Sequence, residues 1–121
     1  MKKRFLIIAL LCFSLGFSQS SANKKAATDF QTAYNASNYE AIFNMFDAEM
    51  KSEMPLERTI VFYTRIKASR GDIKTMEYYN IKDQAAVYKT TFEKDIMDVR
   101  VSLNDTDGKV SGLYIVAQRK K

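Results

Sequence analysis

The sequence predicts an α+β fold, with about three N-terminal helices packed on a curved four-stranded antiparallel sheet. Up to Arg70, apolar residues recur every three to four positions, which is the spacing of a helix with one buried face. After Gly71 the spacing falls to about two, as in a strand, and it continues in four separate runs. Because the helices come first, their apolar stripes must lie across one face of the sheet that follows.

The first two helices are predicted from apolar stripes and a helix start signal. Ser20, Ser21 and Asn23 offer a start for the first helix, whose stripe comprises Ala26, Ala27, Phe30, Ala33 and Tyr34. Ser37 and Glu40 form an S-x-x-E capping box, in which each side chain bonds to the backbone N–H of the other residue. The second helix is therefore expected to begin at Ser37, with a stripe of Tyr39, Ile42, Phe43, Phe46 and Met50.

The third helix is predicted between Pro55 and Gly71. Proline fits a first helical turn because its missing N–H has no partner there, and glycine fits a C-terminal cap. The run 60–63 is also compatible with a strand, because its residues are β-branched or aromatic. The helix is favoured because Lys67 and Arg70 directly precede the glycine. Its expected inner face comprises Leu56, Thr59, Ile60, Tyr63 and Ile66.

Four strands are predicted from alternating side chains over residues 74–81, 85–93, 97–103 and 109–117. The sequence NDTDG at 104–108 is typical of a hairpin turn between the last two of them. We therefore expect strands that are adjacent in sequence to pair with each other.

The first 18 residues have the pattern of a secretory signal peptide. Three basic residues at positions 2–4 precede an apolar run at 5–13, and small residues follow before a cleavage site between Ser18 and Gln19. The run is shorter than the roughly 20 residues of a membrane-spanning helix, so we expect no anchor after processing. Cys12, the only cysteine, falls inside the run, so the processed chain would contain no disulfide. We expect a secreted or periplasmic single domain over residues 19–121.

Charge and residue types exclude several function classes. Loss of the three basic residues lowers the net charge from +5 to +2, and the remaining excess lies at 119–121, so we expect no nucleic-acid binding. The chain has no histidine and no cysteine after residue 18, which argues against zinc, thiol chemistry and the usual general base. We expect no metal or cofactor. The remaining acid–base groups are carboxylates, with Asp47, Glu49 and Glu53 close together, and several tyrosines.

Three segments resemble a secreted bacterial family that contains a domain of unknown function. They are NYEAIFNMFDAEMKSEMPLER at 38–58, the helix end Arg70-Gly71-Asp72, and DGKVSGLYI at 107–115. That domain often lies beside serine-hydrolase or penicillin-binding-type domains, whereas this chain has no G-x-S-x-G motif. The element order also resembles the nuclear transport factor 2-like superfamily, in which a curved sheet forms a cone over helices. The resemblance covers residues 26–116.

This resemblance implies a non-catalytic binding module that holds a small apolar ligand in the cone, or a protein partner on the sheet. The expected pocket wall comprises Phe43, Phe46, Tyr63, Tyr78, Tyr88 and Phe92. The same side chains at helical spacing are also what a core requires, so both interpretations remain open. The alternatives are an isomerase- or dehydratase-like enzyme using Asp or Glu with Tyr, and an accessory protein of a cell-envelope hydrolase. A homodimer formed through the sheet is also plausible.

Overall fold

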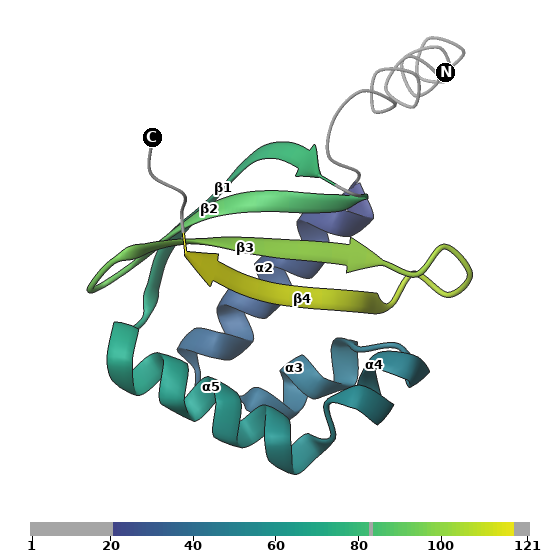
Figure 1. Ribbon diagram of the computed structural model, residues 1–121, viewed down its shortest axis with the longest axis horizontal. Helices are drawn as coiled ribbons and strands as arrows, with labels where there is room; N and C mark the ends of the chain where they lie inside the picture. The colour runs from purple at the N-terminus through teal and green to yellow at the C-terminus, as the bar shows by residue number, and fades with distance from the viewer. Residues whose placement is uncertain (1–20, 83, 118–121) are drawn as a thin grey trace, which may run out of the picture.

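The computed structural model describes residues 21–82 and 84–117, where four helices precede four strands (Figure 1). The helices are α2 (Ser21–Asn35), α3 (Tyr39–Met45), α4 (Ala48–Glu53) and α5 (Leu56–Arg70). The strands are β1 (Ile73–Lys82), β2 (Ala85–Phe92), β3 (Ile96–Leu103) and β4 (Val110–Ala117). They form one antiparallel sheet in the order β1-β2-β3-β4. The α+β prediction is confirmed, and the signal peptide predicted at 1–18 lies outside the described residues.

The helices lie against one face of the sheet, as the alternation of side chains requires. In β3, Met97, Val99 and Val101 belong to the core, so Asp98 and Arg100 face the opposite side. Figure 1 shows α2 crossing behind the sheet, with α3, α4 and α5 below the β4 edge. The second sheet face is therefore free of helices in the described part of the chain.

The predicted second helix is two helices in the structure, so the described residues contain four helices where about three were expected. The break falls at Phe46, whose backbone is extended, and at Asp47, whose side chain accepts a hydrogen bond from the Met50 N–H at 2.8 Å. The Asp47 N–H donates to the Val110 carbonyl at 2.8 Å, which ties the break to the start of β4. The apolar stripe continues through the break, and therefore its period did not reveal it.

The predicted capping box is also wrong by one residue. Asn38 caps α3, because its side chain accepts from the Ala41 N–H at 3.3 Å. Ser37 has a φ of 59° and lies in the turn between α2 and α3, while its hydroxyl accepts a hydrogen bond from Lys67 at 2.8 Å. The tight turn after α2 needs a left-handed residue, and Ser37 occupies that position instead of the cap.

The third helix and its glycine cap are as predicted. Pro55 directly precedes α5, and the Gly71 N–H donates to the Lys67 carbonyl at 2.8 Å with a φ of 84°. A Cβ atom at Gly71 would lie 2.3 Å from Glu93 Oε1, so the close approach of the β2–β3 turn also requires glycine. Ile60, expected on the inner face, is instead 40% exposed. The strand bounds differ from the prediction by one residue at most ends.

The core is rich in aromatic rings. Tyr63 of α5 packs edge-on against Phe30 with ring centroids 5.8 Å apart, and Tyr34 packs edge-on against Phe92 at 5.8 Å. The Tyr63 hydroxyl is buried and has no hydrogen-bond partner, and burial raises its pKa. Among the described residues no helix is long and apolar enough to cross a membrane.

Candidate functional site

The six residues predicted to line a ligand pocket lie in three separate places. Phe46, Tyr63, Tyr88 and Phe92 are buried, whereas Phe43 and Tyr78 are partly buried. Phe43 packs on Phe46, Tyr78 packs on Tyr88, and Tyr63 and Phe92 belong to the ring cluster around Phe30 and Tyr34. Packing of this kind fits the core interpretation, and the ligand-binding role of these residues stays a prediction.

An apolar groove of about 370 Å³ lies beside β4, where helices and sheet edge face each other. We call it the β4 groove. It is lined by Met50, Glu53, Met54, Arg58, Phe62, Leu113, Tyr114, Ile115 and Val116. The hydrophobic members come from α4, from α5 and from both faces of β4, so the groove follows the strand edge. Met54 and Phe62 are only partly buried, which leaves apolar surface accessible.

The corner between α4 and α5 fixes the helical wall of the groove. The Met54 N–H donates to the Met50 carbonyl at 2.8 Å and closes the last turn of α4. Thr59, which is fully buried, donates its hydroxyl to the carbonyls of Met54 at 3.1 Å and Pro55 at 3.0 Å. The hydroxyl satisfies the Met54 carbonyl at the end of α4, and it adds a second bond to the Pro55 carbonyl, which already accepts from the Thr59 N–H at 2.9 Å. The two methionines are thereby held on one side of the corner, facing β4.

The carboxylates considered for catalysis have structural roles or are exposed. Asp47 caps α4, and its second oxygen accepts from the Asn104 side chain at 2.9 Å. The hydrogen bonds from Asn104 and from the Met50 N–H lower the pKa of Asp47, because they favour the charged carboxylate. Glu49 and Glu53 are exposed. These three side chains therefore do not assemble a buried acid–tyrosine site.

A tyrosine–carboxylate pair does occur on the helix-free face of the sheet. The Tyr79 hydroxyl donates to Asp98 Oδ2 at 2.8 Å, and Asp98 is 7% exposed. This hydrogen bond raises the pKa of Tyr79, because it holds the phenol proton. The pair lines a pocket of about 480 Å³ on the side of the sheet away from the helices. The enzyme hypothesis requires an acid–tyrosine pair between the helices and the sheet. The Tyr79–Asp98 pair lies on the other face of the sheet and does not meet this requirement.

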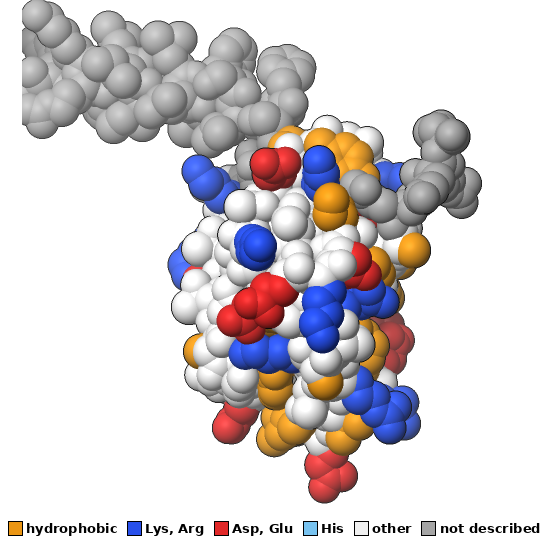
Figure 2. Space-filling view, turned by 90° about the vertical axis from the view of Figure 1, so that its left-hand side faces the viewer, with side chains coloured by type: hydrophobic (Ala, Val, Ile, Leu, Met, Phe, Trp, Pro, Cys, Tyr) orange, Lys and Arg blue, Asp and Glu red, His pale blue; other side chains and the backbone are white. Residues whose placement is uncertain are grey.

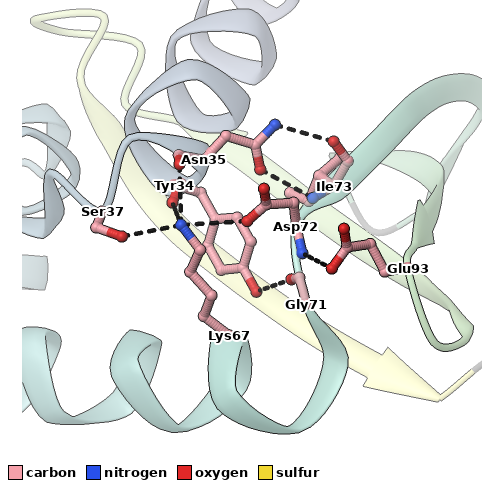
Figure 3. A network of polar contacts seen from close by, with 8 residues as sticks. All are labelled: Tyr34, Asn35, Ser37, Lys67, Gly71, Asp72, Ile73 and Glu93. Carbon is pink, nitrogen blue, oxygen red and sulfur yellow. Dashed lines mark hydrogen bonds and ion pairs between the residues drawn. The ribbon is translucent and has the colours of Figure 1, made fainter.

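A polar cluster closes the opposite end of the helices (Figure 3). We call it the Lys67 cluster, and it comprises Tyr34, Asn35, Ser37, Lys67, Gly71, Asp72, Ile73 and Glu93. The Lys67 ammonium donates to the Asn35 carbonyl at 2.9 Å and to the Ser37 hydroxyl at 2.8 Å, and it pairs with Asp72 at 3.1 Å. Figure 2 views this end of the molecule and shows basic and acidic side chains interspersed over it.

The cluster also accounts for the tripeptide Arg70-Gly71-Asp72. Arg70 forms an ion pair with Asp95, Gly71 caps α5, and Asp72 pairs with Lys67. The Tyr34 hydroxyl donates to the Gly71 carbonyl at 2.8 Å. All three residues are thus used in joining α5 to the sheet, which gives the sequence a structural explanation.

In the described part of the chain, no group of three or more His, Cys, Asp or Glu side chains is placed to hold a metal ion. Comparisons with curated proteins and with solved structures found no match. The family model described as "Protein of unknown function (DUF3887)" matches residues 27–113, which extend from within α2 into β4. The match covers most of the chain and includes the helical wall of the β4 groove, but of the β4 residues that line the groove it includes Leu113 alone. The chain therefore belongs to the DUF3887 family of proteins of unknown function.

Proposed function

We propose that this protein is an exported, non-catalytic binding module of the nuclear transport factor 2-like kind. Its β4 groove would receive an extended segment of a partner protein. One observation carries the proposal: an apolar groove of about 370 Å³ runs along the edge strand of the sheet. The export step rests on the sequence pattern of residues 1–18.

Edge position gives the proposed partner its backbone contacts. In the order β1-β2-β3-β4, the side of β4 away from β3 has no neighbouring strand in the described part of the chain. Among the described residues, the backbone hydrogen bond on this side lies at the start of β4, where the Val110 carbonyl accepts from the Asp47 N–H. A free strand edge can accept an added strand, whose backbone hydrogen bonds give affinity while alternate side chains enter pockets.

Side chains of the groove supply the second component of recognition. Met50 and Met54 are unbranched and adapt to varied shapes, and Phe62 offers a flat apolar surface. Glu53 and Arg58 stand at the groove with opposite charges. An added strand with an apolar residue facing the helices, flanked by polar residues, would match this surface.

The groove is preferred over a ligand site in the cone because of how the predicted wall is packed. Phe46, Tyr63 and Phe92 are at most 2% exposed, and each ring contacts another aromatic ring. A small ligand would have to displace these contacts. The groove requires no such rearrangement.

The proposal can be tested with short random peptides displayed on phage and selected on the folded protein. We expect the selected peptides to share one apolar residue flanked by polar residues, and to shift the NMR signals of β4 amides. Hydrogen exchange at β4 should slow in the complex, because an added strand protects the edge amides. Met54→Glu should abolish binding, since it places a charge in the apolar groove.

Ile60→Glu is the matched control, because Ile60 lies on α5, is exposed and does not line the groove. It should leave binding unchanged. Binding that survives Met54→Glu, or that leaves β4 exchange unaltered, would refute the proposal. Peptides that bind only by blocking self-association would identify a second copy of the chain as the occupant. Selected peptides whose sequences match a segment of a cell-envelope hydrolase would support the role as an accessory protein of such an enzyme.

A further inference from the structure

A second pocket lies on the helix-free face of the sheet and shares Val116 of β4 with the β4 groove. Its volume is about 480 Å³, and it is lined by Tyr79, Asn80, Lys82, Val87, Asp98, Arg100, Val116 and Ala117. We propose that this pocket binds a small carboxylate that carries an ammonium or hydroxyl group next to the carboxylate. This site does not depend on the β4 groove.

The sheet register brings these residues together. Asn80 pairs with Val87, and Val87 pairs with Arg100, so the three stand in one row across β1, β2 and β3. Asp98 pairs with Val116 in the next row. Val87, Asp98 and Arg100 face away from the core, because their neighbours along β2 and β3 are core residues. Asn80 and Val116 face the same way, because they pair with Val87 and Asp98. Val87 and Val116 therefore form an apolar floor between polar walls.

An irregularity in β1 supplies one of the walls. The pairing of β1 with β2 shifts register between Tyr78 and Asn80, which leaves Tyr79 as an extra residue. The extra residue places the Tyr79 ring on the helix-free face, where its hydroxyl bonds to Asp98 two strands away. Bulges commonly re-aim a side chain in this way. Tyr78, in contrast, packs inward on Tyr88.

The charges of the pocket favour an anion. Lys82 and Arg100 are cationic and Asp98 is anionic, so one positive charge is in excess among these three. The Arg100 Nε atom is buried and has no hydrogen-bond partner. A desolvated donor without an acceptor is costly, and a guanidinium binds carboxylates strongly in the planar, two-bond arrangement. A carboxylate beside Arg100 and Lys82 would neutralise this excess.

Asp98 and Tyr79 determine what else the ligand must carry. A negative carboxylate repels a simple anion, whereas an ammonium or hydroxyl group can donate to it. Asp98 accepts from Tyr79, and a carboxylate can accept hydrogen bonds from several donors at once. A group of this kind next to the ligand carboxylate would face Asp98 while the carboxylate faces Arg100. Arg100 and Lys82 thus favour the carboxylate of the ligand, and Asp98 favours a neighbouring ammonium or hydroxyl group.

The test is a titration of the full ¹⁵N-labelled chain with glycine, glycolate, acetate and sulfate, followed by NMR. Glycine or glycolate should shift the Arg100 Nε–H signal and the β3 amides, and should reach saturation. Acetate should bind more weakly by about tenfold, the value of one hydrogen bond to a charged group. Preference for glycine over glycolate would identify the ammonium as the second group, and the reverse would identify the hydroxyl.

Variants separate binding from folding. Lys82→Gln, at an exposed position, should weaken binding by about tenfold without changing the rest of the spectrum. Arg100→Gln should abolish binding, whereas Arg65→Gln, at an exposed position of α5 outside both pockets, should leave it unchanged. Absence of any shift, or an equal shift in the Lys82→Gln variant, would overturn the proposal. Equal binding of acetate would overturn the role of Asp98, and tighter binding of sulfate would overturn carboxylate selectivity.

Discussion

The Lys67 cluster and the β4 groove involve the two ends of the same helix, α5, yet one is closed and the other is open. At the C-terminal end of α5, Lys67 contacts the end of α2, the turn after it and the start of β1. At the N-terminal end, Arg58 and Phe62 face a sheet edge across an apolar groove. The same helix thus carries a structural junction at one end and an accessible surface at the other.

The two ends differ in how far the backbone groups of the neighbouring strand are paired. The Asn35 side chain donates to the Ile73 carbonyl at 2.9 Å and accepts from the Ile73 N–H at 2.8 Å. The Asn35 side chain therefore makes the two hydrogen bonds that a further strand would make with Ile73, the first residue of β1 (Figure 3). Beside the β4 groove, the described contacts of the strand edge are limited to its start at Val110. The edge of β4 beside the groove is the better candidate for binding a partner, because its backbone N–H and C=O groups are available for new hydrogen bonds.

The largest effect is expected from removing the ring that joins the Lys67 cluster to the core. Tyr34→Ala deletes the contacts with Phe30, Tyr63 and Phe92 and the hydrogen bond to Gly71, and it should lower the free energy of unfolding by about 3–5 kcal/mol. Urea denaturation would measure the loss. Tyr34→Phe keeps the ring and should cost only about 1 kcal/mol. Equal losses in the two variants would show that packing of the ring is unimportant.

A smaller effect is expected at the α5 cap. Gly71→Ala introduces a Cβ at a φ of 84° and against Glu93, and it should destabilise the fold by about 1–3 kcal/mol. Thermal unfolding would detect this as a fall in Tm of several degrees. Adding Glu93→Ala should restore only part of the loss, because it removes the clashing carboxylate but leaves the Cβ atom of residue 93, 2.8 Å from the added Cβ, and the unfavourable φ. A double variant no more stable than Gly71→Ala would mean that the contact with the carboxylate has no energetic weight.

The buried Tyr63 hydroxyl lies between the two regions, and its removal is expected to raise the stability of the fold. Tyr63→Phe should stabilise the fold by about 1 kcal/mol, because it removes a buried polar atom that has no partner while keeping the ring contacts. The expected rise in Tm is about 4–8 °C. Tyr39→Phe is the control, since Tyr39 is only partly buried and stacks on the same ring. A loss of stability in Tyr63→Phe would indicate a partner for the hydroxyl.

The smallest effect on stability is expected from Asp47, and it should appear only at acidic pH. The pKa of Asp47 is lower in the folded chain than in the unfolded chain, so the unfolded state binds the proton more readily. The contribution of Asp47 to stability is therefore fully present above about pH 4 and is lost as the pH falls through the lowered folded value. Urea denaturation between neutral and acidic pH should show a shallower decline in Asp47→Asn than in the wild-type chain. Identical declines would contradict the role of these hydrogen bonds.

Local features of the fold were predictable because they depend on nearby residues. The α+β order and the strand positions follow from side-chain period, and the end of α5 follows from a glycine after basic residues. The break between α3 and α4 at Phe46 and Asp47 was not predicted, because it depends on a long-range hydrogen bond from the Asp47 N–H to the Val110 carbonyl. Likewise Lys67 engages Ser37, and Asn38 caps α3 instead.

The class of fold, the family and the residue types available for chemistry could be inferred from the amino-acid sequence. The positions of those residues in space depend on long-range packing, which the structure shows. Phe46, Tyr63, Tyr88 and Phe92 fit a pocket wall equally well in the sequence, and the sheet register together with ring packing put them in the core. The groove and the Arg100 pocket form from segments far apart in the chain, because strand pairing sets their neighbours. Periodicity records which face a residue takes, and pairing across the sheet determines what it meets there.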